Sequence, residues 1–369
     1  MRVLHIVGKM DRAGAETMLM NLYRNIDRAQ IQFDFITFTN EKGDYDDEIY
    51  ALGGEIHAII ANNPIERMLK LRDFLKKHSE YKIVHAHMLL SNTFHLLAAK
   101  LAGIPHRIAH SHNTNTGKSG IIVKLYEKFG IHLINKLSTK KIACGKEAAE
   151  YLYNTAKDVW ILKNAINLNS YQHIAIQNKD YWSITGLPFQ GLKLIQVGRL
   201  NEVKNHIFSL RVAKRLRESG IEFTLFIVGQ GPLENLIKQK IIDNKLEENV
   251  FILGVRADVP QLMAGADVML MPSLHEGFPV VLVESQAIGL PSLLSENIAK
   301  EVDLNLNLIE FLSLKHEDMW VKVLRNLRNK PVSQEEIYKR LQISGFDVKK
   351  NASDLLEFYN RLNSSYLEK

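Results

Sequence analysis

Short apolar runs alternate with longer amphipathic segments along most of the chain. In the first half the runs typical of buried strands stand at 2–7, 33–38, 55–60, 82–87, 107–112, 140–145 and 159–166. The segments between them, such as 15–26 and 121–137, carry apolar residues at helical spacing. Continuous apolar strands that alternate with helices predict a parallel sheet covered on both faces.

The alternation of strand-like and helical segments stops at 167–191, a polar stretch that ends in a Gly/Pro cluster. We expect a domain junction there. Strand-like runs then resume at 192–200, 222–231, 250–255, 267–273, 291–295 and 308–314, and helical segments close the chain. We therefore predict two doubly wound α/β domains, 1–168 and 169–349, that face a central cleft. A C-terminal helix at about 350–369 is expected to pack back on the first domain.

Composition agrees with this division. The 369 residues are 46% hydrophobic and 24% charged, enough material for two globular cores. A single cysteine, Cys144, excludes an internal disulfide and fits a reducing cytoplasm. Charge interrupts the first residues too early for a signal peptide, and no stretch reaches the roughly 18 apolar residues of a membrane span. We expect a cytoplasmic protein, either soluble or peripheral to a membrane.

The net charge of +6 lies entirely in the first half. Residues 1–168 hold 23 Lys/Arg against 17 Asp/Glu, whereas the remainder is balanced. Within 100–146 a single acid, Glu127, accompanies nine cations: Lys100, Arg107, Lys118, Lys124, Lys128, Lys136, Lys140, Lys141 and Lys146. With the apolar residues of 121–137, this charge predicts docking on anionic lipid. The alternative is that the apolar side packs on the sheet and the lysines are only solvated. We expect no nucleic-acid partner, because no aromatic-interleaved basic motif is present.

Two carboxylates, Glu276 and Glu284, flank an apolar segment in HEGFPVVLVESQ. Pro279 suits the first turn of a helix, so Glu276 is expected in a strand-to-helix loop and Glu284 inside the helix. At about 1.5 Å per residue the carboxylates lie roughly 10 Å apart, about the distance from a hexose to the ribose of a sugar nucleotide. The helix N-terminus between them suits a diphosphate. Alternatively, Glu276 only complements the helix dipole and Glu284 lies on a solvated face.

Further candidates stand in other strand-to-helix loops. Arg199 and Lys204 follow a predicted strand and could clamp a phosphate, or could simply be solvated. Gly8 and Gly14 permit a close approach of the backbone to a ligand, but they do not complete a dinucleotide fingerprint.

Four histidines, His85, His87, His110 and His112, stand at alternate positions of two predicted strands. They suggest a metal site. We expect none, on the assumption that alternate positions point to opposite faces of the sheet and because no carboxylate stands at a supporting spacing.

In combination these motifs resemble the family 4 retaining glycosyltransferases, which have the GT-B fold of two Rossmann-like domains. The resemblance covers nearly the whole chain, in the family's order: RAGAETMLMNL, ILKNAINL, GRLNEVKN, GQGPLENL, VFILGVRADV and ADVMLMPSLHEGFPVVLVESQAIGLP. The block with glutamates at 276 and 284 is the strongest match. Two departures, Asn164-Ala165-Ile166-Asn167 at the junction and SENIAKEV after a later strand, are typical of the branch that builds bacterial exopolysaccharide or capsule repeats.

The resemblance implies a role for each matching residue. Glu284 would bind the ribose of the donor, and Glu276 would contact the transferred sugar. The backbone N–H groups of Gly277 and Phe278 would reach the sugar hydroxyls and phosphate. Arg199 and Lys204 would hold the departing diphosphate. His112 would lie near the reacting centre, Gly14 would lie near the donor phosphate, and the backbone around Val255 would face the base.

These roles imply a metal-independent transferase without a cofactor. It would move a hexose or N-acetylhexosamine from a nucleotide sugar, and we expect that donor to be a UDP-sugar. The acceptor would be a glycan or a polyprenyl-diphosphate-linked sugar at the inner face of the cell membrane. A glycosidase is a rival, but its carboxylates lie about 5–9.5 Å apart, slightly closer than we expect here. The other rivals are a sugar-nucleotide epimerase on a similar fold, which needs no acceptor, and a catalytically silent binding subunit.

Overall fold

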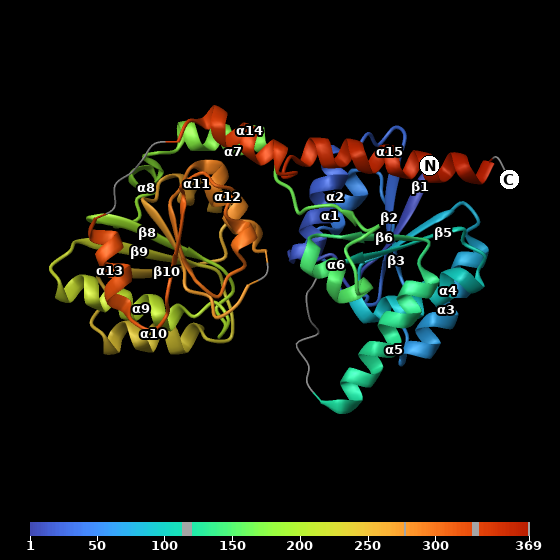
Figure 1. Ribbon diagram of the computed structural model, residues 1–369, viewed down its shortest axis with the longest axis horizontal. Helices are drawn as coiled ribbons and strands as arrows, with labels where there is room; N and C mark the ends of the chain where they lie inside the picture. Colours follow the sequence, from blue (N-terminus) through green and yellow to red (C-terminus); the bar gives the residue numbers. More distant parts are fainter. Residues whose placement is uncertain (113–119, 277, 327–331, 368–369) are drawn as a thin grey trace. The chain divides into compact units, whose positions relative to one another are not determined.

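The structure is a computed structural model that describes residues 1–112, 120–276, 278–326 and 332–367 (Figure 1). The chain forms two compact units. Unit 1 comprises Met1–Ala165 and Asp347–Lys369, and unit 2 comprises Ile166–Phe346. No helix in the described part of the chain is long and apolar enough to cross a bilayer.

Unit 1 contains a seven-stranded parallel sheet in the order β3-β2-β1-β4-β5-β6-β7. Its strands are β1 (Arg2–Ile6), β2 (Gln32–Thr37), β3 (Ile56–Ala58), β4 (Ile83–Ala86), β5 (His106–Ser111), β6 (Lys140–Ala143) and β7 (Trp160–Ile161). All seven predicted strands are confirmed, although β7 keeps only two residues of its predicted run.

Helices cover both faces of this sheet. They are α1 (Gly14–Asn25), α2 (Asp46–Ala51), α3 (Pro64–Lys77), α4 (Asn92–Leu101), α5 (Ile121–Leu137), α6 (Lys146–Tyr153) and α15 (Val348–Leu367), with a 3-10 turn, η1 (Leu89–Ser91). On one face α1 and α15 pack against the strands, with Leu19 and Leu355 buried beside Phe33. On the other face α3 to α6 bury residues such as Leu96 and Leu152.

Unit 2 contains a six-stranded parallel sheet in the order β10-β9-β8-β11-β12-β13. Its strands are β8 (Leu192–Val197), β9 (Phe223–Val228), β10 (Val250–Gly254), β11 (Val268–Met271), β12 (Ser292–Ser295) and β13 (Ile309–Leu312). These six strands were also predicted from their apolar runs. Two sheets of this kind confirm the predicted fold class.

The helices of unit 2 again form two layers around the sheet. They are α7 (Leu168–Gln177), α8 (Tyr181–Ile184), α9 (His206–Glu218), α10 (Glu234–Asp243), α11 (Val259–Ala264), α12 (Val280–Ile288), α13 (Glu317–Arg325) and α14 (Gln334–Ile343), with a 3-10 turn, η2 (Lys300–Val302). Phe208 and Trp320 anchor α9 and α13 on one face. Leu262 and Leu282 anchor α11 and α12 on the other.

The polar stretch 167–191 contains two of these helices. The side chain of Asn167 accepts a hydrogen bond from the Ser170 N–H at 3.2 Å and caps α7. In α8, Trp182 is 1% exposed, stacks on Phe226 and donates a hydrogen bond to the Leu262 carbonyl at 2.8 Å. Helix α8 is therefore anchored in unit 2.

Each sheet has a switch point, where neighbouring strands lead to helices on opposite faces. In unit 1 it lies between β1, which leads to α1, and β4, which leads to α4. In unit 2 it lies between β8, which leads to α9, and β11, which leads to α12. Ligands of open α/β sheets bind beyond the carboxyl ends of the strands at such points. Most of the predicted site residues stand there.

Candidate active site

The switch point of unit 2 is framed by two loops, one between β8 and α9 and one between β11 and α12. The Asn205 side-chain amide donates to the Pro272 carbonyl at 3.0 Å, and the Leu274 N–H donates to the Val203 carbonyl at 2.8 Å. Because both bonds cross from one loop to the other, the two loops are held in a fixed register.

Lys204 and Glu276 form an ion pair across these loops. The Lys204 Nζ lies 2.7 Å from Glu276 Oε1, and the two side chains are only 18% and 19% exposed. The Gln196 side-chain amide donates to the Lys204 carbonyl at 2.9 Å. The Glu276 backbone bridges to Ile298, and its carbonyl accepts from the Ala299 N–H at 3.2 Å. Thus the SENIAKEV segment, which departs from the usual family pattern, positions Glu276.

Glycines allow the strand ends beside this pair to pack closely. Gly198 has φ +155°, and a Cβ there would lie 3.0 Å from Lys204 Cε. Gly229 has φ +138°, and a Cβ there would lie 2.1 Å from the Gly198 carbonyl oxygen. The Gly229 N–H also donates to the Gly254 carbonyl at 2.8 Å. After Gly254 comes Val255, which is 60% exposed at the same edge of the sheet and is therefore open to a ligand.

Arg199 lies in the β8–α9 loop and is exposed. It makes no ion pair with any residue that the structure describes, whereas Lys204 in the same loop is paired. The loop thus offers one cation already bound to a carboxylate and one cation open to an anionic ligand.

Helix α12 begins at Val280, one residue after the predicted position, with Pro279 as its N-cap. The first N–H groups of a helix have no intrahelical partner, so this end can bind an anion. Phe278 precedes it and stacks on Phe346, with ring centroids 5.3 Å apart and planes at 17°. Gly277 lies outside the described residues, so its predicted role is untested.

Glu284 lies in the second turn of α12 and binds a residue that the sequence analysis did not predict. The Tyr171 hydroxyl, from α7, donates to Glu284 Oε1 at 2.7 Å. Burial raises the pKa of Glu284 above its ordinary value, and the hydrogen bond from Tyr171 opposes that rise. Burial, reinforced by the Glu284 charge, raises the pKa of Tyr171, so the phenol remains a donor. Only the helical spacing of Leu168, Tyr171 and Ala175 hinted at an inward-facing tyrosine.

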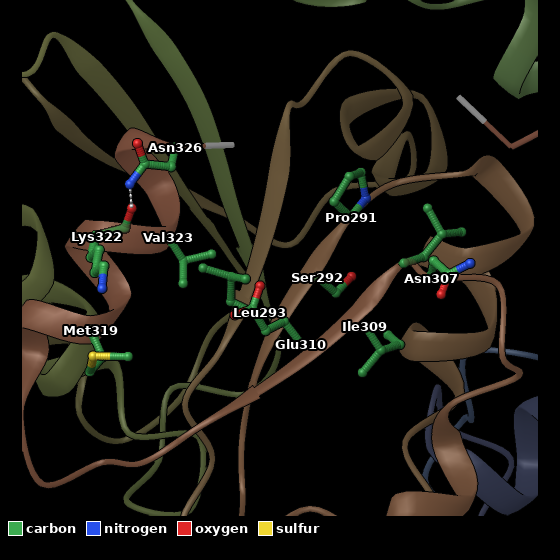
Figure 2. A pocket seen from close by; sticks show the side chains of 11 residues that line it. Pro291, Ser292, Leu293, Asn307, Ile309, Glu310, Met319, Lys322, Val323 and Asn326 are labelled. Carbon is green, nitrogen blue, oxygen red and sulfur yellow. Dashed lines mark hydrogen bonds between the residues drawn. The ribbon is translucent and has the colours of Figure 1, made fainter. Parts of the chain in front are cut away.

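A separate pocket in unit 2 lies at the starts of β12 and β13 and beside α13 (Figure 2). Pro291, Leu293 and Ile309 line it together with polar groups such as Lys322 and Asn326, and the Asn326 amide donates to the Lys322 carbonyl. Because it opens at the amino ends of these strands, it is distinct from the switch-point site.

In unit 1, Gly14 is the first residue of α1, beyond the carboxyl end of β1. Its N-cap, Ala13, makes no side-chain capping bond, and the first N–H groups of a helix have no intrahelical partner. A Cβ added at Gly14 would meet no described atom within 4 Å, whereas one at Gly8 would lie 3.5 Å from Met88 Cε. The predicted approach of Gly14 to a donor phosphate stays a prediction.

The histidines of unit 1 correct our assumption about strand faces, which was wrong, because positions i and i+2 of a strand share a face. His85 and His87 project from β4 and the residue after it, and His110 and His112 do the same at β5. The ring centroids of His85 and His87 lie 4.3 Å apart, and those of His110 and His112 lie 4.1 Å apart. His5 of β1 joins them, with a centroid 5.2 Å from that of His85.

Hydrogen bonds and burial define the protonation state of these histidine rings. His5 Nδ1 lies 3.0 Å from His87 Nε2, and His87 Nδ1 lies 2.9 Å from His112 Nε2. The Tyr359 hydroxyl of α15 lies 2.7 Å from His85 Nδ1. Burial lowers the pKa of His112 to about 4 and that of His5 to about 3, and it lowers the pKa of His87 well below its ordinary value. These histidines are therefore neutral at physiological pH.

Neutral imidazoles are metal ligands, and two sets of three, His5/His85/His87 and His87/His110/His112, have ligand atoms within 4.8 Å. A metal ion, however, must lie in the plane of each ring, about 2.0–2.1 Å from its nitrogen. Within these sets several ring nitrogens already bond to one another, since His5 Nδ1 pairs with His87 Nε2 and His87 Nδ1 pairs with His112 Nε2. The expectation that these histidines hold no metal stays a prediction.

Comparison with known proteins places the chain among sugar-transferring enzymes. Residues 12–170 match the family described as Glycosyltransferase Family 4, and residues 183–303 match Glycosyl transferases group 1. The putative glycosyltransferase EpsF of Bacillus subtilis is 37% identical, over 97% of this chain and 96% of its own. The UDP-Gal:alpha-D-GlcNAc-diphosphoundecaprenol alpha-1,3-galactosyltransferase of Escherichia coli is 27% identical, over 89% and 94%.

Solved structures show the same fold. Anabaena Alr3699/HepE in complex with UDP superposes with a TM-score of 0.78 at 16% identity, covering 98% of this chain and all of that one. At this identity the likeness concerns the fold.

Proposed function

Because the chain belongs to the family 4 glycosyltransferases of the GT-B fold, we propose that it transfers a sugar, with retention at the anomeric carbon, from a nucleotide diphosphate to a glycan or lipid-linked acceptor. UDP is the nucleotide we favour, since a relative acts on UDP-Gal and a structural neighbour binds UDP. The observation that carries the proposal is the Lys204–Glu276 ion pair beside the open cation Arg199 at the switch point of unit 2.

The chemistry follows from these charges. Cleavage of the sugar–phosphate bond leaves negative charge on the diphosphate, and Arg199, Lys204 and the N-terminus of α12 would stabilise it electrostatically. Glu276 would bind the transferred sugar, and Glu284, held by Tyr171, would bind the ribose. The two cations would take the place of a metal ion. The acceptor hydroxyl would pass its proton to the departing phosphate, so the reaction needs no side-chain base.

We propose that unit 1 binds the acceptor and that its exposed helical surface docks on a membrane. Helix α5 buries Gly130, Ile134 and Leu137, and its other side is open to solvent. On that side Leu125, Tyr126 and Phe129 are 63%, 45% and 61% exposed, among the exposed lysines Lys124, Lys128 and Lys136. Lys118, which belongs to the same predicted basic region, lies outside the described residues. In Figure 1 the first turns of α5 extend past α3 and α4.

An apolar surface ringed by lysines suits the cytoplasmic leaflet, where anionic lipid attracts each cation by about 1 kcal/mol. An acceptor linked to polyprenyl diphosphate cannot leave the bilayer. A peripheral enzyme at that surface fits assembly of exopolysaccharide or capsule, and capsular polysaccharide biosynthesis is the process in the name of the Staphylococcus aureus relative CapH.

A thermal-shift screen followed by a transfer assay tests the proposal. A nucleotide that binds the folded protein raises its stability by RT ln(1 + [L]/Kd), so UDP and one UDP-sugar should raise the melting temperature more than ADP- or GDP-sugars do. The stabilising sugar nucleotide should then label a polyprenyl-diphosphate-linked acceptor. Conversion of the donor without an acceptor would instead identify an epimerase, and binding without turnover of any acceptor would identify a silent subunit.

A further inference from the structure

One partly buried arginine of unit 1, Arg67, has no anionic partner among the described residues. It lies near the start of α3, and its Nε atom is buried without a hydrogen-bond partner in the described part of the chain. The other partly buried arginines that the structure describes in unit 1 each donate to a carboxylate or a main-chain carbonyl: Arg2 to Asp34, Arg72 to Asp73, Arg28 to Tyr23 and Arg107 to Leu137. Arg67 is the exception.

A small aromatic platform supports the guanidinium of Arg67. Its Cζ atom lies 4.4 Å from the centroid of the Phe38 ring, and the His95 ring stacks on that ring with centroids 4.9 Å apart. Burial, reinforced by the Arg67 charge, lowers the pKa of His95 to about 3, so His95 is neutral at physiological pH. Arg67 is therefore the charged member of this group of three.

The acid beside Arg67 in the chain is already bound elsewhere. Glu66 pairs with the Lys70 ammonium at 2.7 Å and accepts from the Asn62 N–H at 2.9 Å. Charged side chains are rarely buried unless they are paired, because removal of a charge from water is costly. An anionic ligand would supply the missing partner, and it can reach Arg67 because part of that side chain is exposed.

The platform stands at the edge of the sheet where a ligand of unit 1 is expected. Phe38 is the first residue after β2, and its N–H donates at 3.1 Å to the carbonyl of Gly8, in the loop between β1 and α1. Ligands of open α/β sheets bind beyond this carboxyl edge. A ligand there would therefore lie within reach of the platform.

Helix α4 links the platform to α5, the helix for which we propose membrane docking. His95 belongs to α4, and the Thr93 hydroxyl of the same helix donates to the Gly130 carbonyl of α5 at 3.3 Å. Arg67, on α3, thus belongs to the same helical layer as α5. An anion carried at the surface of a bilayer is the ligand that this position favours.

We propose that Arg67, supported by Phe38, binds the diphosphate of a lipid-linked acceptor. The identity of this ligand as the acceptor rests on the proposed function, whereas the diphosphate contact can be tested without turnover. Guanidinium groups bind phosphate oxygens through paired N–H donors. The cations of unit 2 already serve the diphosphate of the donor in the proposed reaction, so the anion at Arg67 belongs to the second substrate.

Acceptor kinetics test this contact. One acceptor carries its sugar on farnesyl diphosphate, and the other carries the same sugar on an uncharged alkyl chain. Arg67→Met keeps an apolar stem over Phe38 but removes the charge. We expect kcat/KM for the diphosphate acceptor to fall by about 10- to 100-fold. The value for the uncharged acceptor and the KM for the donor should stay within about threefold of wild type.

Two further variants on the same helix are controls. Arg67→Lys keeps a cation and should lose less activity than Arg67→Met. Arg72→Met should keep its activity with both acceptors, because Arg72 is already paired with Asp73 at 2.7 Å. Equal losses with both acceptors in Arg67→Met would indicate a structural role and overturn the proposal. A loss confined to an uncharged chain that carries a uronic acid would also overturn it, because the ligand would then be a sugar carboxylate.

Binding of farnesyl diphosphate separates this proposal from the proposed function. The measurement uses the full-length variant Arg199→Ala with Lys204→Ala, so that these cations of unit 2 do not contribute. We expect this protein to bind farnesyl diphosphate, and the additional change Arg67→Met to weaken that binding about tenfold or more. If the wild-type protein transfers no sugar, the proposed function fails, while this measurement still decides the site. Absence of binding, or binding that Arg67→Met does not weaken, would overturn the proposal.

Discussion

The Lys204 ammonium lies 2.7 Å from the Glu276 carboxylate, and the two residues stand in loops that follow neighbouring strands, β8 and β11. Each side chain is less than one fifth exposed. In the proposed enzyme, one of these charges faces the diphosphate and the other faces the sugar. The pair would therefore lie where the bond to be broken joins the two halves of the donor.

Replacement of Glu276 by Gln should nearly abolish transfer and leave the fold intact. The amide keeps the size of the side chain but removes its charge, and a lost electrostatic contact of this kind typically costs about 10²–10³ in rate. Because the pair is less than one fifth exposed, loss of one charge leaves Lys204 less compensated and should lower the melting temperature, but the variant should still fold. Steady-state transfer and thermal unfolding measure both effects. Activity within about threefold of wild type would remove Glu276 from the reaction.

Arg199→Ala and Lys204→Ala should each weaken nucleotide diphosphate binding and slow turnover, with a loss of roughly 2.7–4 kcal/mol in barrier. The double variant should lose less than the sum, because both cations serve one diphosphate. Lys214→Ala on α9 is the matched control, since Lys214 is exposed and pairs only weakly with Glu218, at 4.0 Å. Additive losses would place the two cations on separate groups, and an unaffected single variant would place its residue outside the site.

The sequence predicted the strands and the loops of the site because both are local patterns. Most strands of both sheets are dominated by apolar residues, and Arg199, Lys204 and Glu276 lie in the loops that follow β8 and β11. The parallel order of the strands then brings these loops to one edge of the sheet. Local composition and the topology of α/β folds were sufficient to place these three residues.

Contacts between distant segments were not predictable in the same way. Tyr171 and Glu284 are 113 residues apart, and no spacing rule links a tyrosine after the domain junction to a glutamate in α12. His5 and His87 meet because β1 lies beside β4, a neighbour relation that the apolar runs do not encode. The histidine faces were misassigned because the two-residue period of a strand was applied incorrectly.

Glu284→Gln should stabilise unit 2 at neutral pH while weakening nucleotide binding. The pKa of Glu284 is raised on folding, so the protonated form stabilises the fold below about pH 4.5 and this contribution is lost as the pH rises through the folded pKa. At pH 8 the ionised, buried carboxylate therefore opposes folding, and a neutral amide that can still accept from Tyr171 does not. The melting temperature of the variant, relative to wild type, should be higher at pH 8 than at pH 4.5. Glu247→Gln, at an exposed position, is the control. If the melting temperatures of Glu284→Gln and wild type differ by the same amount at pH 8 and at pH 4.5, this explanation is wrong.

Binding of α5 to anionic membranes is the last prediction. Vesicles that contain anionic lipid should co-sediment the protein, and neutral vesicles should not. Binding should fall as salt rises, because exposed charges are screened beyond about 8–10 Å at physiological ionic strength. Changing Lys124, Lys128 and Lys136 to Glu should lower the partition coefficient by about a hundredfold or more, since each lost cation is worth about 1 kcal/mol.

Matched variants in unit 2 separate a specific surface from net charge. Lys214, Lys238 and Lys240 are 45–55% exposed, and changing them to Glu alters the total charge by the same amount. That control should keep most of the binding if α5 is the docking surface. The double variant Leu125→Ser with Phe129→Ser should weaken vesicle binding even at low salt, because it removes apolar side chains that would be buried in the membrane. The matched control, Leu236→Ser with Ile242→Ser on the exposed side of α10, should not weaken it. If the two triple lysine variants lose vesicle binding equally, the binding depends on net charge and not on α5. If the protein sediments equally with neutral and anionic vesicles, the proposed membrane surface is rejected.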